Sequence, residues 1–427
     1  MTHPGPYERL NELVDRHRFA EPGFDQLISP MPIPHADIFE GFQLRFSTIR
    51  RFQQNSLDVL RDEMLARGET SELGEMLLND APSNVRRTYH RSLDDSHWTL
   101  PLFYRTDEVL PGRIAEVQCP GSLWGDHQLL RTYYSESGHN EQLGPRSLAD
   151  SFCDSVIRHL DGLPPLVHHL FDNSSAPAGM RYFVASTRGR LKYFGLDTGL
   201  RALDCSLIRS HSFFGLMGEN FARTRREMCR EGLIKYDHPP TILYGQKISL
   251  VLPFLDETRD RFDDEIRSNL IYSYPVRPRG FRLPDGQWTT LEDFAKRQRR
   301  LRQYFLKYAG CDVSINWGSR AVFNLGNIGR EECLRRLEAA ASDYVRGKVW
   351  LVQPSEAEHT TVSYFSVEGD ELQADMTSKY SGFYGPDGLL GVLVQYRRFY
   401  KVHGQPDTVA SIITPGPPRD NDLSGIH

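Results

Sequence analysis

Residues 105–118 read Arg-Thr-Asp-Glu-Val-Leu-Pro-Gly-Arg-Ile-Ala-Glu-Val-Gln, and the expected fold is built outward from this stretch. We predict extended segments over Trp98–Tyr104 and Arg113–Val117, because a turn signal, Pro111-Gly112, lies between two runs of strand-forming residues. The stretch therefore predicts a β-hairpin or a strand pair.

Three oxygen-bearing side chains of this strand pair could share one face. Glu116 and Gln118 are two residues apart, so they project from the same side of a strand. Asp107 lies on the neighbouring piece and could approach that face across the turn. Two carboxylates and an amide oxygen suit Mg²⁺ when phosphates supply further ligands. The alternative is a solvent-facing polar edge in which Arg105 pairs with Asp107.

A second polar region follows the predicted strand Tyr304–Tyr308. Lys307 lies near the end of this apolar strand, and the loop Gly318-Ser319-Arg320 precedes a predicted strand over Ala321–Leu325. Backbone N–H groups of a small-residue loop can approach phosphates closely, and lysine adds a point charge. The alternative is a plain hairpin in which Gly318 turns the chain.

The apolar segment Val349–Gln353 ends at Pro354. The end of such a strand can present backbone groups to the edge of an adenine ring, so Gln353 marks a candidate nucleotide contact. The alternative is a buried strand that stops at the proline.

Composition excludes several classes of protein. The 427 residues carry 51 Lys+Arg against 56 Asp+Glu, a net charge of −5, and this balance lacks the general attraction that non-specific nucleic-acid binders use. No apolar run approaches the ~20 residues of a membrane span. The six cysteines are scattered, without C-x-x-C pairs, so reduced thiols are expected. We therefore expect a cytoplasmic protein that acts on small molecules, without nucleic-acid or membrane partners, and possibly as a homodimer.

Hydrophobic spacing and turn residues predict the remaining elements and a mixed α/β chain. The boundaries that we expect are a helical segment at 1–97, the strand pair at 98–145, an α/β substrate region at 146–258, a part at 259–413 that holds the candidate nucleotide contacts and a disordered tail at 414–427. Among the individual elements are helices at Ile49–Ala66, Ser147–Leu160, Thr289–Gln303 and Arg330–Tyr344, and extended segments at Met180–Ser186, Ile242–Phe254, Thr360–Val367 and Leu389–Tyr400.

In their order along the chain, these pieces resemble the circularly permuted ATP-grasp ligases, the group that includes glutathionylspermidine synthetase. In that group an R-x-D…E-x-N segment comes early, and the lysine, glycine-loop and adenine-linker segments come in the last third. The matching pieces here are Arg105-x-Asp107…Glu116-x-Gln118, then Phe305-Leu-Lys307-Tyr…Gly318-Ser-Arg320, then Leu351-Val-Gln353-Pro. Gln118 stands where the family has Asn, and Tyr308 replaces a proline. The resemblance covers roughly residues 100–412.

The resemblance implies an α/β, circularly permuted ATP-grasp fold preceded by an N-terminal helical segment. It also implies an ATP-dependent carboxylate–amine ligase that forms an amide or peptide bond through an acylphosphate and releases ADP and phosphate. The alternatives are a catalytically degenerate ATP-grasp protein that binds nucleotide as a partner or scaffold, and an unrelated α/β transferase in which Lys307 is structural.

The implied cofactors are ATP and Mg²⁺. The residues that the resemblance assigns fall into three groups: Asp107, Glu116 and Gln118 for the metal; Lys307, Gly318, Ser319, Arg320, Gln353 and, on a basic helix, Lys296 for ATP; and Arg105 and Arg398 as catalytic residues that orient oxyanions.

Overall fold

The structure is a computed structural model. It describes residues 5–16, 26–66, 71–81, 86, 99–119, 124–144, 146–170, 178–194, 206–210, 227–237, 246–310, 315, 321–356, 358–399 and 407–416.

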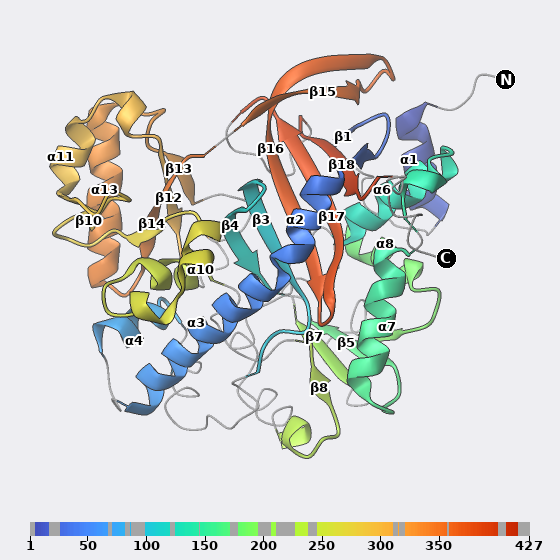
Figure 1. Ribbon diagram of the computed structural model, residues 1–427, viewed down its shortest axis with the longest axis horizontal. Helices are drawn as coiled ribbons and strands as arrows, with labels where there is room; N and C mark the ends of the chain where they lie inside the picture. Colours follow the sequence, from blue (N-terminus) through green and yellow to red (C-terminus); the bar gives the residue numbers. More distant parts are fainter. Residues whose placement is uncertain are drawn as a thin grey trace, which may run out of the picture.

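The largest sheet has eight strands and a largely antiparallel core (Figure 1). In spatial order its main path is β15 (His359–Phe365), β1 (Leu27–Ile28), β18 (Val409–Thr414), β17 (Gly388–Arg397), β16 (Glu371–Gly385), β3 (Tyr104–Leu110) and β4 (Arg113–Gln118), and β2 (Ile33–Pro34) pairs with β18. β15 also pairs with the first half of β16. The edge of β16 that it pairs with is the same edge that pairs with β3 further along the strand. The strands β15, β1, β18, β17 and β16 therefore close into a ring.

Helices cover both faces of this sheet. On one face lie α2 (Ala36–Leu44) and the long helix α3 (Phe46–Ala66), drawn in blue across the front of Figure 1. On the other face lie α6 (Trp124–Glu136) and α7 (Leu148–Leu160). Side chains along β16 alternate accordingly: Tyr380 and Tyr384 join the core beneath α2, whereas Phe383 joins the core beneath α6.

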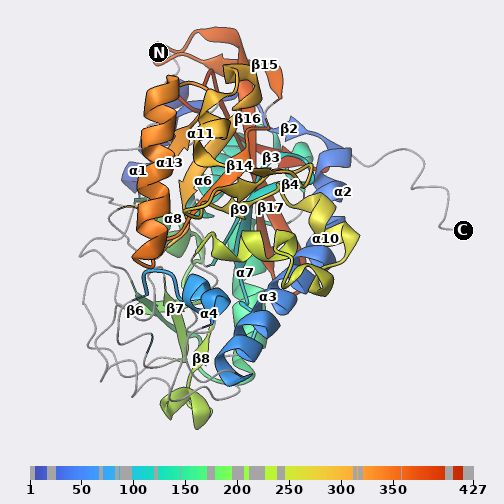
Figure 2. The same ribbon diagram turned by 90° about the vertical axis from the view of Figure 1, so that its left-hand side faces the viewer.

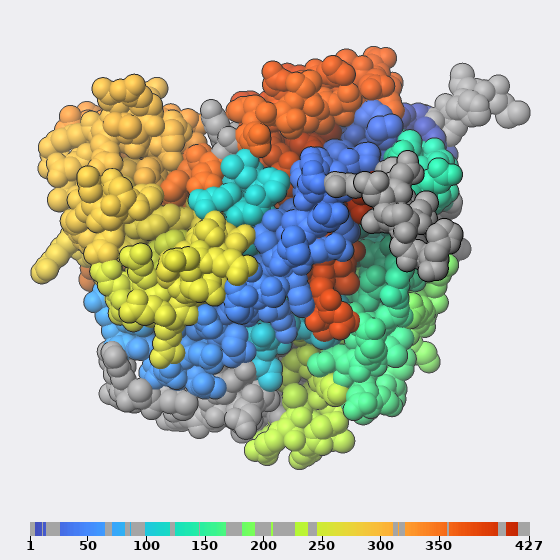
Figure 3. All heavy atoms as spheres, in the orientation of Figure 1, coloured from blue at the N-terminus to red at the C-terminus, as the bar shows by residue number. Residues whose placement is uncertain are grey.

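A second sheet stands beside the first. Its order is β13 (Val322–Asn324), β12 (Tyr304–Tyr308), β14 (Trp350–Pro354) and β9 (Tyr274–Pro275). The helices α11 (Leu291–Lys296) and α13 (Arg330–Val345) pack together on its outer side, as Figure 2 shows. Figure 3 shows an indentation in the molecular outline between this lobe and the β15–β16 hairpin, with residues of the β3–β4 hairpin near its foot.

The remaining described elements connect or flank these layers. A parallel sheet contains β6 (Lys192–Phe194), β5 (Leu166–Leu170), β7 (Leu207–Ser210) and β8 (Lys235–Tyr236). The others are α1 (Pro6–Arg16), α4 (Glu72–Leu77), η2 (Asn140–Gln142), α8 (Ala178–Ser186), η6 (Ile248–Phe254), η7 (Arg259–Arg261), α10 (Asp264–Asn269), β10 (Phe281–Arg282), β11 (Trp288–Thr289) and η8 (Arg299–Leu301). None of the helices in the described ranges is long and apolar enough to cross a membrane.

Several predicted elements are confirmed, because their signals are local. α3 covers the predicted helix Ile49–Ala66, and α13 covers Arg330–Tyr344. α7 begins after Ser147, whose hydroxyl accepts a hydrogen bond from the N–H of Asp150. The helix predicted over Thr289–Gln303 is shorter than expected, because α11 ends at Lys296 and is capped by Thr290.

Other predictions are wrong. Met180–Ser186, predicted as a strand, belongs to helix α8. Ile242–Phe254, predicted as extended, is a 3₁₀ helix over Ile248–Phe254, and residues 241–245 lie outside the described residues. Both runs are short and apolar, and such runs do not separate a buried strand from a buried helical segment.

The mixed α/β class is confirmed, and the predicted domain boundaries stay predictions. The pattern also missed β16, β18 and α6. β16 joins an early strand of the chain, β3, to two late strands, β15 and β17.

Gly382 on β16 is a test of this packing. A Cβ there would lie 2.6 Å from Cδ1 of Phe42, a buried ring of α2, so Gly382→Ala should lower the free energy of unfolding by about 1–3 kcal/mol through overpacking. Urea denaturation measures the loss. Gly385→Ala in the same strand is the control: its Cβ would meet the flexible end of Leu390 at 3.2 Å, so it should cost less. Equal losses would contradict the packing described here.

Candidate functional site

The register of three strands places polar side chains on one face of the main sheet. Asp107 on β3 lies opposite Glu116 on β4, and Arg105 lies opposite Gln118. On its other edge, β3 places Asp107 opposite Ser381 of β16. Directly opposed residues share a face, so these side chains project together.

Asp107 is the most heavily bonded group of this face. Its carboxylate accepts two hydrogen bonds of 2.9 Å from Nε and Nη2 of Arg105 and one of 2.9 Å from the hydroxyl of Ser381. Lys379 Nζ lies 3.5 Å from its Oδ2. Burial raises the pKa of Asp107, but the charges of Arg105 and Lys379 outweigh burial and hold this pKa well below its usual range. The carboxylate is therefore ionised at neutral pH.

Glu116 lies beside Asp107 and pairs with a lysine from another part of the chain. Lys247 Nζ, just before η6, is 2.9 Å from Glu116 Oε1. Burial and the charge of Asp107 raise the pKa of Glu116. The charges of Lys247 and Lys307 lower this pKa by more, so it lies below the usual value for a glutamate. The two carboxylates are thus both held in the charged form.

The second sheet contributes Lys307 to the same cluster. Lys307, on β12, donates from Nζ to Oε1 of Gln353 on the neighbouring strand β14. Gln353 Nε2 in turn donates to the hydroxyl of Ser273 at 3.0 Å and lies 3.4 Å from the carbonyl oxygen of Ala115 on β4. Gln353 therefore ties the lysine strand to the main sheet.

Among the described residues, the cluster holds more cationic side chains than carboxylates. Four cationic side chains accompany the carboxylates of Asp107 and Glu116: Arg105, Lys247, Lys307 and Lys379. Burial lowers the pKa of Lys307 to about 8, because the attraction of Glu116 does not offset burial and the repulsion of Lys247. Buried cationic groups are costly to desolvate, and an anionic ligand in contact with them reduces that cost. Phosphate groups fit this requirement.

The carboxylate pair also suits a hard cation. Asp107 and Glu116 are opposed on one face and ionised, and Gln118 is half-buried on the same face. A cation at Asp107 would share its carboxylate with Arg105 and Ser381. Within the described ranges, no group of three or more His, Cys, Asp and Glu side chains forms a self-sufficient metal site. A Mg²⁺ ion held here would therefore depend on the oxygens of a bound phosphate.

The other residues predicted from the sequence lie elsewhere. Lys296 is on α11, largely exposed, and pairs with Glu292 at 2.6 Å. Arg398 is exposed beyond the end of β17, where Nη2 is 3.4 Å from the hydroxyl of Tyr364. Neither contacts the cluster through the bonds described. Gly318, Ser319 and Arg320 lie outside the described residues.

Lys247 and Lys379 were not predicted from the sequence. Lys379 lies on β16, the strand that the pattern missed, although Tyr380 and Tyr384 are spaced as on one face of a strand. Lys247 lies within Ile242–Phe254, the segment that was wrongly predicted as extended, directly before η6. An isolated lysine gives no local signal of the partner that it meets in the folded chain.

The comparisons with known proteins concern the fold. No protein-family model matches the chain, and no curated protein matches its sequence. Among solved structures, the chain is similar to a glutathione synthetase-like effector (GSS30) from Globodera pallida in its apo form. The TM-score is 0.52 at 12% sequence identity, and the match covers 96% of this chain and 98% of that one. The chain therefore has a glutathione synthetase-like fold, and the permuted order stays a prediction.

The pKa of Lys307 makes a testable contribution to stability. Because this pKa is about 8 in the folded chain and about 10.4 in an unfolded one, folding releases a proton between these values. The free energy of unfolding contributed by Lys307 should therefore rise with pH above about 8. Compared with Lys307→Met, the native chain should gain stability between pH 8 and pH 10, as measured by urea denaturation. Lys192→Met, which removes an exposed lysine of β6, is the control. A constant difference between native chain and Lys307→Met over this range would contradict the buried cation.

Proposed function

We propose that the protein is an ATP-dependent carboxylate–amine ligase that forms an amide or peptide bond and releases ADP and phosphate. The observation that carries the proposal is the gathering of Lys247, Lys307 and Lys379 between the two sheets, next to two ionised carboxylates. The glutathione synthetase-like fold supports it, since the structural neighbour is named after glutathione synthetase, a ligase.

In the proposed mechanism, the lysines of the cluster bind the phosphates. Lys307 approaches from the second sheet, and Lys247 and Lys379 approach from either side of the carboxylate pair. Phosphoryl transfer spreads negative charge over the phosphate oxygens, and preorganised cations in a buried site stabilise that charge more strongly than water does. The lysines thus stabilise the transition state and hold the nucleotide.

Mg²⁺ would be held by Asp107, Glu116 and Gln118 together with phosphate oxygens, and it would neutralise charge on the transferring group. Arg105 has a further role here. Its guanidinium grips Asp107 with two parallel hydrogen bonds, so Arg105 orients the carboxylate and keeps it ionised. We therefore assign Arg105 as a positioning residue and not as a direct contact of the substrate.

The remaining assignments rest on the resemblance. The main chain at Gln353 is proposed to contact adenine, while its side chain positions Lys307. The loop Gly318–Arg320 is proposed to cover the phosphates, and water exclusion by such a loop would protect an acylphosphate. Lys296 and Arg398 are retained as weaker proposals, because both lie outside the cluster.

One observation favours a second candidate, a nucleotide-binding protein without catalysis. Arg105, Ser381 and Lys379 already occupy much of the hydrogen-bonding capacity of Asp107. A metal ligand that is this strongly engaged would bind Mg²⁺ weakly. The structural neighbour is also named an effector.

Binding and turnover of Mg-ATP separate the candidates. The native chain should bind Mg-ATP, measured by calorimetry, and should release ADP and phosphate when pools of amino acids and amines are added. Lys307→Met should weaken binding about ten- to a hundredfold, because a charged hydrogen bond to phosphate is lost. Lys192→Met should bind normally.

The metal ligands are tested separately by Glu116→Gln. This change keeps the shape of the side chain and removes its charge, so turnover should fall and the required Mg²⁺ concentration should rise. Binding without turnover in any pool would support the second candidate. The ligase proposal and the nucleotide-binding candidate both fail if the native chain does not bind ATP.

A further inference from the structure

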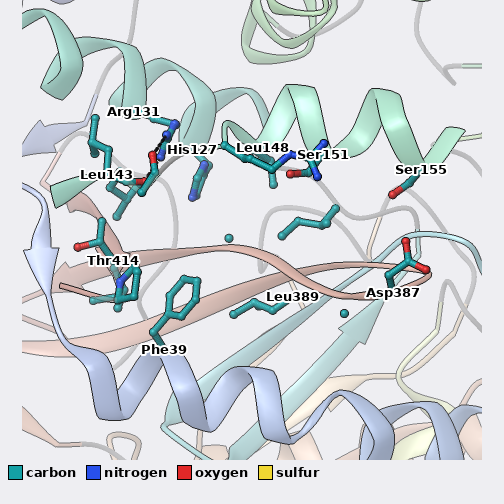
Figure 4. A pocket seen from close by; sticks show the side chains of 18 of the residues that line it. Phe39, His127, Arg131, Leu143, Leu148, Ser151, Ser155, Asp387, Leu389 and Thr414 are labelled. Carbon is teal, nitrogen blue, oxygen red and sulfur yellow. Dashed lines mark hydrogen bonds between the residues drawn. The ribbon is translucent and has the colours of Figure 1, made fainter. Parts of the chain in front are cut away.

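A cavity of about 490 Å³ lies between α6 and α7 on one side and α2 on the other (Figure 4). None of the residues of the cluster around Asp107 lines it. The first four residues of β17, Gly388–Gly391, line the cavity, and so do Thr414 and Pro415 at the end of β18. The cavity is therefore separate from the proposed ATP site.

The cavity exists because β18 stops before it reaches the start of β17. The ladder between the two strands ends at the pair of Val392 with Ile413. Continued in the same register, it would place Pro415 opposite Leu390, and proline has no N–H with which to pair. The segment Gly388–Gly391 therefore has β16 on one edge, and none of the described strands pairs with its other edge. Main-chain N–H and C=O groups of an open strand edge thus border the cavity.

The charged side chains of the lining already have partners. Arg131 donates hydrogen bonds to two main-chain carbonyl oxygens of the loop before α7. Arg158 pairs with Asp387, and Arg146 pairs with Asp154. An ion that entered the cavity would lose hydration without meeting an unpaired charge of opposite sign. The cavity therefore suits an uncharged ligand.

Two hydroxyl groups of α7 can serve such a ligand. Ser151 and Ser155 are one helical turn apart, and both line the cavity. Neither hydroxyl has a hydrogen-bond partner among the described residues. Ser155 is 2% exposed, and Figure 4 shows its oxygen pointing from α7 toward the cavity. By contrast, Nδ1 of His127 is sealed within the protein and offers nothing to a ligand.

The other walls are apolar. They are formed by side chains of α2, α7, β17 and β18, namely Phe39, Leu148, Leu389, Leu390 and Ile412. Phe39 and Leu389 lie across the cavity from α7 in Figure 4. A concave space of this size that is mostly apolar and has a few polar groups is typical of small-molecule sites.

We propose that this cavity binds a small uncharged molecule with an apolar body and one secondary amide group. A secondary amide carries one N–H and one C=O, so it can extend the pairing that β18 leaves incomplete along β17. The amide lies against the main chain of Leu389 and Leu390, beside the hydroxyl of Ser155, and the apolar body packs against Phe39 and Ile412. Binding needs neither ATP nor Mg²⁺.

N-Benzylacetamide is the probe, and two analogues separate its features. Benzyl acetate has the same shape without the N–H, and phenylacetate has a similar apolar body with a negative charge. Ligand-observed NMR on the full chain, without nucleotide, should show saturable binding of N-benzylacetamide. Benzyl acetate should bind about fivefold more weakly, because one hydrogen bond is lost, and phenylacetate at least about tenfold more weakly, because its charge meets no unpaired cation.

Hydrogen–deuterium exchange locates the probe on the chain. Saturating N-benzylacetamide should slow exchange of the main-chain amides within Leu389–Gly391, where the strand edge is open. Exchange within Val392–Tyr396, which is already paired with β18, should not change. Unchanged exchange within Leu389–Gly391 would contradict binding at this edge.

Two variants test the walls of the cavity. Leu389→Trp fills the space and should abolish binding. Ser155→Ala removes one hydroxyl and should weaken binding about threefold, and it serves if Leu389→Trp does not fold, because alanine favours the helix. Ser342→Ala, which changes an exposed serine of α13, is the matched control and should bind as the native chain does.

Absence of saturable N-benzylacetamide binding to the native chain would overturn the proposal. Native-like binding by Leu389→Trp or by Ser155→Ala would also overturn it, and so would equal affinity for phenylacetate. Because no nucleotide is present, these results are independent of the ligase proposal.

Discussion

The bidentate pair between Arg105 and Asp107 is the interaction on which the candidate site depends. It is buried on β3, where water cannot compensate either charge. A buried pair of this kind contributes little net stability, but removing one partner is costly because the other charge is left alone. Ser381 and Lys379 of β16 complete the shell around Asp107. The same contacts thus join an early strand to a late one and hold a carboxylate ionised.

The two sheets meet at this cluster, and their junction sets its chemistry. Gln353 bonds to Lys307 on its own sheet and reaches Ala115 on β4 of the other. This arrangement places a lysine with a pKa of about 8 opposite two ionised carboxylates. Groups that are costly to bury persist where they serve a ligand, and cationic groups gathered in a buried site suit an anionic one.

Local patterns predicted the elements that rest on local interactions. The helices α3 and α13 follow from apolar spacing. The strand predicted over Trp98–Tyr104 is wrong in its bounds, because β3 runs from Tyr104 to Leu110 and so carries Asp107 opposite Glu116. The errors concern short apolar runs such as Met180–Ser186 and Ile248–Phe254, whose state is set by what packs around them. β16 was missed although it is the longest strand described, because its polar and glycine-rich stretch resembles a loop until its neighbours are known.

The sequence by itself determined which residue types stand at the β3–β4 turn and on the Lys307 strand, because strand alternation is a property of neighbouring residues. Only the tertiary structure decided that Lys247 and Lys379 join them, and that Lys296 and Arg398 do not. Each of these outcomes depends on contacts between segments that are distant in the sequence. The shape, burial and charge of the packed segments select those contacts, and a local sequence pattern does not contain this information.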